Sequence, residues 1–213
     1  ASRGLGDVYK RQYLTITKEI KNAIPDMHIH AFSPLEVYQG ATTLGVSLDS
    51  FLGMLRDAGL GSLPGTAAEV LDDDVRKILC PDKLNTKQWL DIVATAHNVG
   101  LKTTSTIMFG HIDTPTNWAK HLMQLRDLQK KTQGITEFVP LPFVHMEAPI
   151  YLRGLARPGP TWRETVLMHS VARLVLYPCI NNIQTSWVKL GPLGATACLC
   201  LLYTSDAADD MQC

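Results

Sequence analysis

The sequence predicts an α/β protein built as a partial (βα)₈ barrel of the TIM type, with about five of the strands present. Five β-branched or apolar segments alternate with amphipathic helical segments, and no hairpin signal lies between them, which is the pattern of parallel βαβ units. No Gly-x-Gly-x-x-Gly follows a strand, which argues against a dinucleotide-binding sheet. A complete barrel takes about 250 residues and eight strands, so this chain holds only part of one.

Each predicted element has its own signal. The five strands have β-branched, aromatic or apolar runs and cover 27–32, 60–63, 101–110, 136–145 and 182–191. Four helices have an apolar face at helical spacing together with a cap or a terminal glycine, and cover 47–59, 85–100, 114–134 and 161–177. A shorter helix is predicted to begin at residues 66–71, because Thr66 and Glu69 have the spacing of a capping box. The segment 33–46 and the segment 146–160 are predicted to be loops that follow strands.

Composition narrows the class of protein. The 213 residues include 20 Lys+Arg and 20 Asp+Glu, so the charge balance gives no argument for nucleic acid or an anionic membrane as partner. No stretch approaches the roughly 20 apolar residues of a membrane span. The five cysteines have no framework spacing, which predicts a reduced, cytoplasmic setting.

The two ends differ from the interior. Residues 1–12 and 198–213 have neither helical nor strand periodicity that joins to the rest, and both resemble translated adapter sequence. We therefore expect non-native ends and a single barrel domain over residues 13–197.

Polar side chains gather where the predicted strands end. Because the carboxyl ends of barrel strands surround one opening, we expect these residues to meet there: His28, His30, Met108, His111, His145, Glu147, Gln184, Ser186 and Trp187. His-x-His with further histidines suggests a metal-dependent hydrolase, since imidazoles are common ligands of catalytic metals. No carboxylate from a later strand completes such a site, and a single strand-end histidine is more often a hydrogen-bonded neighbour than a ligand.

Several motifs resemble one enzyme family. "HIHAFSPLEV", "GLGSLPGTAAEVL", "KTTSTIMFGHIDTP", "EFVPLPFVHMEAPIY" and "NIQTSWVKLGP" resemble the tyrosine-using half of FO synthase over about residues 15–195. The resemblance implies a barrel of the radical S-adenosylmethionine (SAM) superfamily in deazaflavin (coenzyme F-420) biosynthesis. It implies that a radical made from SAM attacks L-tyrosine, and that the 4-hydroxybenzyl group is transferred to 5-amino-6-(D-ribitylamino)uracil.

One family motif does not occur. Radical SAM enzymes bind a [4Fe–4S] cluster through Cys-x-x-x-Cys-x-x-Cys, because cluster iron needs thiolate ligands, and this chain has no such spacing. We therefore expect an internal fragment whose full-length parent uses SAM and the cluster, while the fragment alone is inactive. No metal ligand is predicted in this chain. Unpaired strand edges are expected to favour aggregation.

The resemblance also implies roles for individual residues. Catalytic roles in proton handling or substrate positioning fall to His145, Glu147 and His30. SAM contacts fall to Glu69, Ser105 and Met108, and substrate contacts to His28, Ser33, Glu36, His111, Gln184, Ser186 and Trp187. The implied partners are the two small substrates and a fused or separate half that closes the deazaflavin ring.

Three alternatives remain open at this point. A related radical SAM enzyme of the futalosine route to menaquinone shares similar motifs, but "PLPFVHMEAP" and "QTSWVKLGP" favour the first assignment. The metal-dependent hydrolase and a non-catalytic barrel remnant that binds or scaffolds are the other two.

Overall fold

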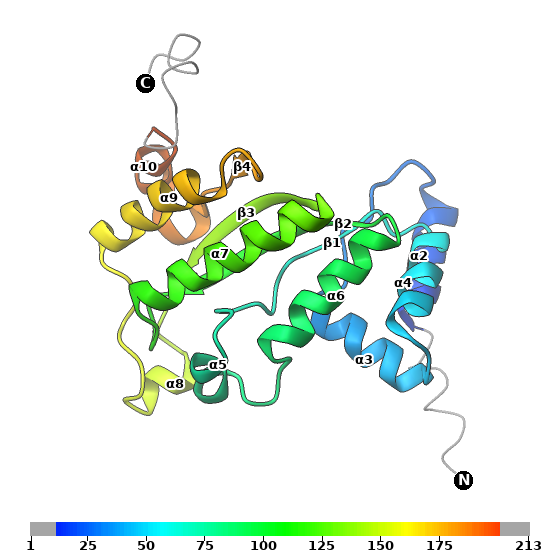
Figure 1. Ribbon diagram of the computed structural model, residues 1–213, viewed down its shortest axis with the longest axis horizontal. Helices are drawn as coiled ribbons and strands as arrows, with labels where there is room; N and C mark the ends of the chain where they lie inside the picture. Colours follow the sequence, from blue (N-terminus) through cyan, green and yellow to red (C-terminus); the bar gives the residue numbers. More distant parts are fainter. Residues whose placement is uncertain (1–11, 201–213) are drawn as a thin grey trace.

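A parallel sheet organises the computed structural model, which describes residues 12–200 (Figure 1). Its four strands lie in the order β1 (Ser62–Leu63), β2 (Lys102–Phe109), β3 (Ile135–Pro142) and β4 (Asn182–Ile183), and all neighbours are parallel. His30 adds one isolated parallel bridge to Ser62, where the first predicted strand lies. The predicted α/β class and parallel pairing are confirmed. Sequential strand order without reversal is the order found along a barrel wall.

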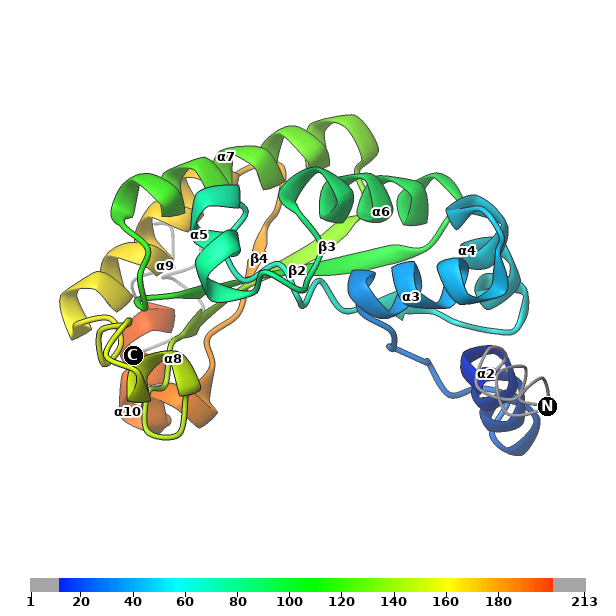
Figure 2. The same cartoon turned by 90° about the horizontal axis from the view of Figure 1, so that it is seen from below.

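Helices connect successive strands. They are α2 (Gln12–Ala23), α3 (Pro34–Leu44), α4 (Leu48–Asp57), α5 (Asp73–Leu79), α6 (Thr86–Asn98), α7 (Pro115–Thr132), α8 (Pro149–Leu152), α9 (Trp162–Leu176) and α10 (Trp187–Cys200). Figure 2 shows α6 and α7 along one face of the sheet, with α8 and α10 on the other side near one end and α2 near the opposite end. No helix within residues 12–200 is both long enough and apolar enough to cross a membrane.

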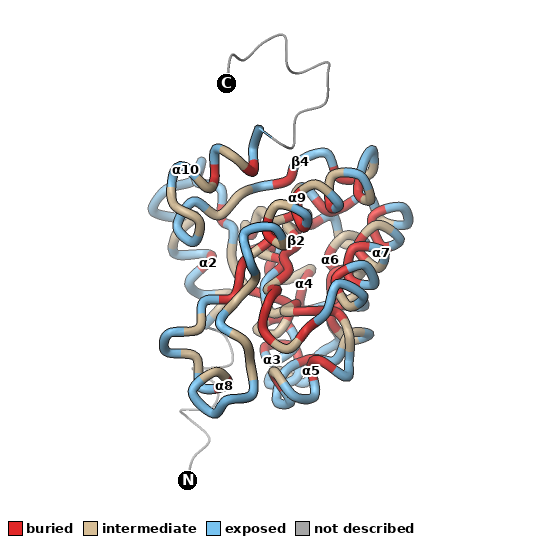
Figure 3. The backbone as a smooth tube through the Cα atoms, turned by 90° about the vertical axis from the view of Figure 1, so that its left-hand side faces the viewer, coloured by how far each residue is buried: buried red, intermediate tan, exposed pale blue. Residues whose placement is uncertain are grey.

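The hydrophobic core lies between the sheet and the helices that cover it. Its fully buried side chains include Phe51, Trp89, Phe109 and Phe138. Phe109 on β2 meets Trp118 of α7 edge to face, with ring centroids 5.4 Å apart. Figure 3 shows buried segments along β2 and along the inward sides of α6 and α7. Burial of this apolar area is the main force that holds the helices to the sheet.

Four of the predicted helices form where the sequence places them. α4, α6, α7 and α9 follow Ser47, Asn85, Thr114 and Thr161, all in extended N-cap conformations, and all but α4 have a capping box. The local signals at these starts agree with the packing, since each helix also has an apolar face to bury.

The prediction of a helix that begins at Thr66 is wrong. Residues 66–71 form turns, with Ala67 and Glu69 in the left-handed region at φ 58° and 46°, and α5 begins at Asp73 after the N-cap Asp72. The reason is a tertiary contact. The amide of Gly65 donates to Thr104 Oγ1 at 2.9 Å, and the Thr106 hydroxyl donates to the Gly65 carbonyl at 2.8 Å. These bonds hold the segment after β1 against β2, where a helix starting at Thr66 does not form.

Other elements differ at their bounds. The predicted loop at 33–46 contains helix α3, which has a capping box between Ser33 and Glu36, and the predicted loop at 146–160 contains α8. The last predicted strand is reduced to Asn182–Ile183, because Trp187 begins α10. Gln12 and Cys198–Cys200 lie in α2 and α10, while the remainder of both predicted non-native ends lies outside the described residues.

Candidate functional site

The two histidines of the first strand segment meet at one hydroxyl group. His28 Nε2 lies 2.8 Å and His30 Nδ1 lies 2.7 Å from Ser62 Oγ, while Ile29 between them is buried in the core. Side chains two apart in an extended chain point to the same face, so the predicted shared orientation is confirmed. A Cβ on Gly61 would lie 2.4 Å from His28 Cε1, so glycine leaves room for the ring in this position.

The histidine pair is not at the same level of the sheet as the end of β2. His30 pairs with Ser62, and Ser62 pairs with Lys102, the first residue of β2. Met108 follows six positions later, roughly 20 Å along the strand at the usual rise per residue. The expectation that His28, His30, Met108 and His111 surround one opening is therefore wrong, because the first segment is paired with Ser62 of β1, which lies opposite the first residue of β2.

Glu69, Met108 and His111 do come together at the carboxyl end of β2. The Met108 amide donates to the Glu69 carbonyl at 2.9 Å, and His111 Nε2 donates to the Met108 carbonyl at 2.9 Å. This edge unites one residue from the loop after β1 with two from β2 and its loop. It is the part of the predicted site that the structure assembles.

The carboxylate of Glu69 has one fixed partner. Lys83 Nζ lies 2.8 Å from Glu69 Oε1, and the Glu69 side chain is 17% exposed. Desolvation is the largest single effect and acts to lower the pKa of Lys83. The hydrogen bond and charge of Glu69, together with Cys80 and Asp82, outweigh it and raise that pKa. The pair occupies Oε1 of Glu69 and leaves Oε2 able to accept a hydrogen bond.

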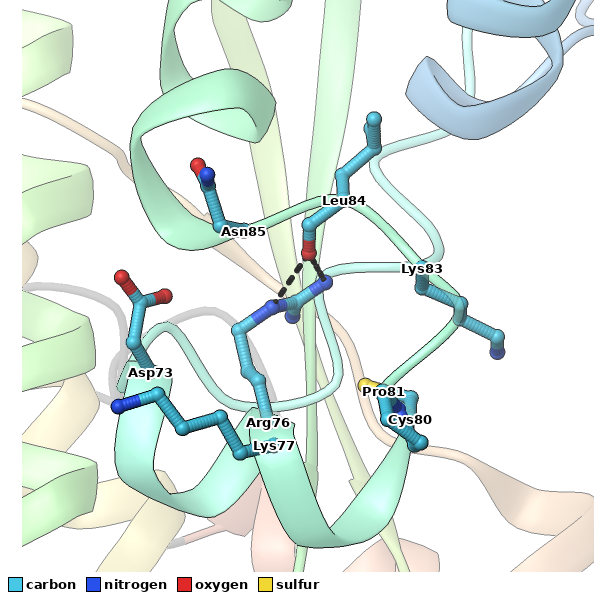
Figure 4. A pocket seen from close by; sticks show the side chains of 8 residues that line it. All are labelled: Asp73, Arg76, Lys77, Cys80, Pro81, Lys83, Leu84 and Asn85. Atoms are coloured by element: carbon cyan, nitrogen blue, oxygen red, sulfur yellow. Dashed lines mark hydrogen bonds between the residues drawn. The ribbon is translucent and has the colours of Figure 1, made fainter.

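Arg76 holds the loop that carries Glu69. Its buried guanidinium donates to the carbonyls of Ala67, Ala68, Val70 and Leu84, with 2.8 Å between Nε and the Leu84 oxygen. Figure 4 shows Arg76 reaching from α5 to Leu84 beside a pocket of about 280 Å³. One side chain thus joins the turn at 67–70 to the segment that leads into α6.

His111 is enclosed by its own loop. Nδ1 accepts from the Ile112 amide at 2.7 Å while Nε2 donates to Met108, so both ring nitrogens are used by the backbone and the side chain is fully buried. Burial lowers the pKa of His111, and the neighbouring Asp113 acts in the opposite direction. His111 therefore shapes the loop in this structure, and its predicted substrate contact stays a prediction.

Asp113 ties this loop to α7. Its carboxylate accepts from the amides of Gly110 and His111, at 3.0 and 2.7 Å, and from the indole N–H of Trp118. These three N–H donors stabilise the buried carboxylate.

The loop after β3 packs against the same edge. The Arg157 amide donates to the His111 carbonyl at 3.1 Å, and its guanidinium binds both carboxylate oxygens of Glu164 at 2.9 and 2.8 Å. His145 stacks edge to face on Tyr151 with ring centroids 4.5 Å apart, and Glu147 is exposed. The structure therefore places His145 and Glu147 on the loop that borders the edge, without a hydrogen bond between them.

Most of the remaining predicted residues have hydrogen-bond partners within this chain. The Ser33 hydroxyl donates to Glu36 Oε2 at 2.7 Å within the cap of α3, and Ser105 is buried with its hydroxyl bonded to the Glu137 carbonyl. Gln184 hydrogen-bonds Glu137 across β3 and β4. Ser186 precedes α10 and Trp187, 67% exposed, begins it, so the prediction that both lie on the last strand is wrong. Their predicted contacts with SAM or substrate are untested by this arrangement.

Four residues that organise the site are not among the residues predicted from the sequence. They are Ser62, Arg76, Lys83 and Asp113, and each acts through a partner distant in sequence or through backbone groups. Only Asp113, two residues beyond a strand-end histidine in "GHIDTP", stands where a loop-forming carboxylate is common.

Comparisons with known proteins place the chain beside two groups of enzymes, although no family model matches it. It is 53% identical over 179 residues to the FO synthase of Mycobacterium leprae and 51% identical over 187 residues to that of Streptomyces avermitilis. These alignments cover 84% and 88% of this chain but only 21% and 22% of those proteins. The 5-amino-6-(D-ribitylamino)uracil–L-tyrosine 4-hydroxyphenyl transferase of Methanothermobacter thermautotrophicus is 51% identical over 179 residues, which are 84% of this chain and 49% of that enzyme.

Proposed function

We propose that this chain, whose predicted resemblance to the tyrosine-using half of FO synthase is confirmed by these relatives, forms the middle of a radical SAM transferase. The reaction would move the 4-hydroxybenzyl group of L-tyrosine to 5-amino-6-(D-ribitylamino)uracil in deazaflavin biosynthesis. The observation that carries the proposal is the 51% identity over 84% of the chain to a relative named for those two substrates. Because the chain spans about half of that relative, the activity is proposed for the whole enzyme.

The edge at the end of β2 supports a SAM-binding role for Glu69. Its carboxylate is paired with Lys83, its backbone is fixed to Met108, and its loop is fastened by Arg76. A carboxylate held in this way can accept hydrogen bonds from ribose hydroxyls or from an ammonium group. SAM bound there would supply the radical that starts the reaction.

Substrate contacts are proposed for the loop after β3 and for the inner polar residues. His145 and Glu147 lie on a loop that packs against the edge, and histidine is the side chain most used to accept or donate a proton near neutral pH. His28, His30 and Gln184 lie with Glu137 on one polar side of the sheet. L-Tyrosine and the uracil both offer polar groups that such residues can bind.

The iron–sulfur cluster does not fit the cysteines described here. Cys80 and Cys198 are buried and Cys179 and Cys200 are distant from Cys80 in sequence, and within residues 12–200 no three metal-binding side chains converge. Cluster ligands would therefore come from another part of the full-length enzyme, and the chain alone would not generate the radical.

A chimera tests this proposal. Residues 13–197 replace the homologous half of the Methanothermobacter transferase, and the product of L-tyrosine and the uracil is measured after cluster reconstitution. We expect transfer activity from the chimera and none from the 213-residue chain alone. A matched chimera with Glu69→Gln should fold normally and bind SAM at least about tenfold more weakly, because the charge is lost while the shape is kept. A folded chimera that holds the cluster yet transfers nothing would contradict the proposed reaction.

A further inference from the structure

The hydroxyl of Ser62 lies between two imidazoles that face it at hydrogen-bonding distance. A hydroxyl has one proton to donate, so at most one of His28 Nε2 and His30 Nδ1 accepts from it, and the other must donate to its oxygen. We infer that His28, Ser62 and His30 form a proton relay, in which Ser62 passes a proton from one imidazole to the other. The relay's use in the reaction rests on the proposed function, whereas the coupling of the two rings does not.

The backbone fixes the three groups relative to one another. The amides of Gly61 and Ser62 both donate to the Ile29 carbonyl, at 2.9 and 3.1 Å, and the Ala31 amide donates to the Ser62 carbonyl at 3.1 Å. The missing side chain of Gly61 leaves the space that the His28 ring fills. These contacts fix the backbone positions from which the two exposed rings and the hydroxyl project.

The charged groups around the pair favour a single shared proton. Desolvation and the charge of His28 lower the pKa of His30, while Glu137 of β3 acts in the opposite direction. Two lysines near this segment donate to carbonyls. Lys102 of β2, which pairs with Ser62, donates to that of Gln133 at 2.9 Å, and Lys21 of α2 donates to those of Pro25 and Met27 at 3.0 and 2.6 Å. Two imidazolium ions on one hydroxyl would repel, so the second proton binds less readily than the first.

The transfer step conserves protons. It begins with His28 protonated on both nitrogens and His30 neutral with Nδ1 free to accept. His28 Nε2 gives its proton to Ser62 Oγ as Ser62 gives its own to His30 Nδ1, which leaves His28 neutral, Ser62 unchanged and His30 protonated. Glu137 stabilises that second state. His30 could then give the proton to a substrate group, or the sequence could run in reverse.

A titration of the 213-residue chain tests the relay without any cofactor. The imidazole carbon and nitrogen signals of His28 and His30 are followed by NMR for the native protein and for Ser62→Thr and Ser62→Val. Threonine and valine are matched in shape and suit an extended chain, but only threonine keeps the hydroxyl. We expect both rings to show the same two titration steps in the native and threonine proteins, and separate single steps in the valine protein.

Two results would overturn the relay. One is an equal response of the threonine and valine proteins. The other needs no variant. It is a spectrum of the native protein, at a pH above both titration steps, in which neither His28 Nε2 nor His30 Nδ1 carries a proton. In the chimera, Ser62→Val should lower kcat at least about tenfold relative to Ser62→Thr with little change in KM. A coupled titration with an inactive chimera would leave the relay standing and refute the proposed reaction instead.

Discussion

Acid should destabilise the fold through His121, a fully buried histidine on α7. Its Nδ1 accepts from the Leu71 amide at 3.0 Å, and burial lowers its pKa to about 3. In the unfolded chain the pKa returns to about 6.5, so below that pH the unfolded state takes up a proton that the folded state refuses. The stabilisation is therefore complete above pH 6.5 and is lost progressively as the pH falls toward 3.

The size of this effect follows from the two pKa values. Between pH 7 and pH 5 the unfolded histidine becomes almost fully protonated while His121 stays neutral, which lowers the free energy of unfolding by about 2 kcal/mol. His97, whose pKa burial lowers to about 4, acts in the same direction, with a smaller share because its ring is partly open to solvent. His111 and His169 have pKa values lowered by burial and add to the trend.

Urea denaturation followed by circular dichroism at the two pH values measures the effect. In His121→Asn the amide oxygen can still accept from Leu71 but cannot be protonated near neutral pH. The variant will be less stable at both pH values, yet its loss of stability between pH 7 and pH 5 should be about 2 kcal/mol smaller than that of the native chain. The matched change His145→Asn, at a half-exposed ring, should leave the difference intact. An unchanged pH dependence in His121→Asn would refute the reasoning.

Two further predictions concern stability. Arg76→Met should lower the free energy of unfolding by at least about 3 kcal/mol, because it leaves several buried carbonyls without a donor. The control Arg153→Met, at an exposed arginine, should change that free energy by less than about 0.5 kcal/mol. Equal effects of the two changes would contradict the role given to Arg76. Gly65→Ala should lower the free energy of unfolding by about 3 kcal/mol, since its Cβ would lie 2.1 Å from the Thr104 carbonyl oxygen. The control Gly53→Ala, in the open interior of α4, should raise that free energy by up to about 1 kcal/mol. Denaturation curves that show no loss of stability in Gly65→Ala would refute the close packing of this loop on β2.

Local signals in the sequence were sufficient wherever they agreed with the packing. Asn85, Thr114 and Thr161 each precede an apolar face and start the predicted helices. Thr66 and Glu69 have the same spacing but start no helix, because hydrogen bonds that join Gly65 to Thr104 and Thr106 hold this segment against β2. The segment of helix α3 is predicted to be a strand-end loop from its polar, Gly and Pro residues, although Ser33 and Glu36 form a capping box.

The candidate site shows the same limit. Spacing alone predicts that His28 and His30 share a face, and Ser62 confirms it. Strand register is not encoded in any local pattern, so the sequence could not indicate that the pair lies opposite the start of β2. Arg76 escaped notice for a related reason, because its acceptors are backbone carbonyls that have no identity in the sequence.

The most direct test of the proposed transfer uses ring-labelled L-tyrosine with the reconstituted chimera. Mass spectrometry should find the labelled 4-hydroxybenzyl group joined to 5-amino-6-(D-ribitylamino)uracil, and the yield should fall when Glu69→Gln is introduced. Labelled tyrosine recovered intact from a folded, cluster-loaded chimera, or cleaved with no label on the uracil, would contradict the assignment of this chain to the transferase.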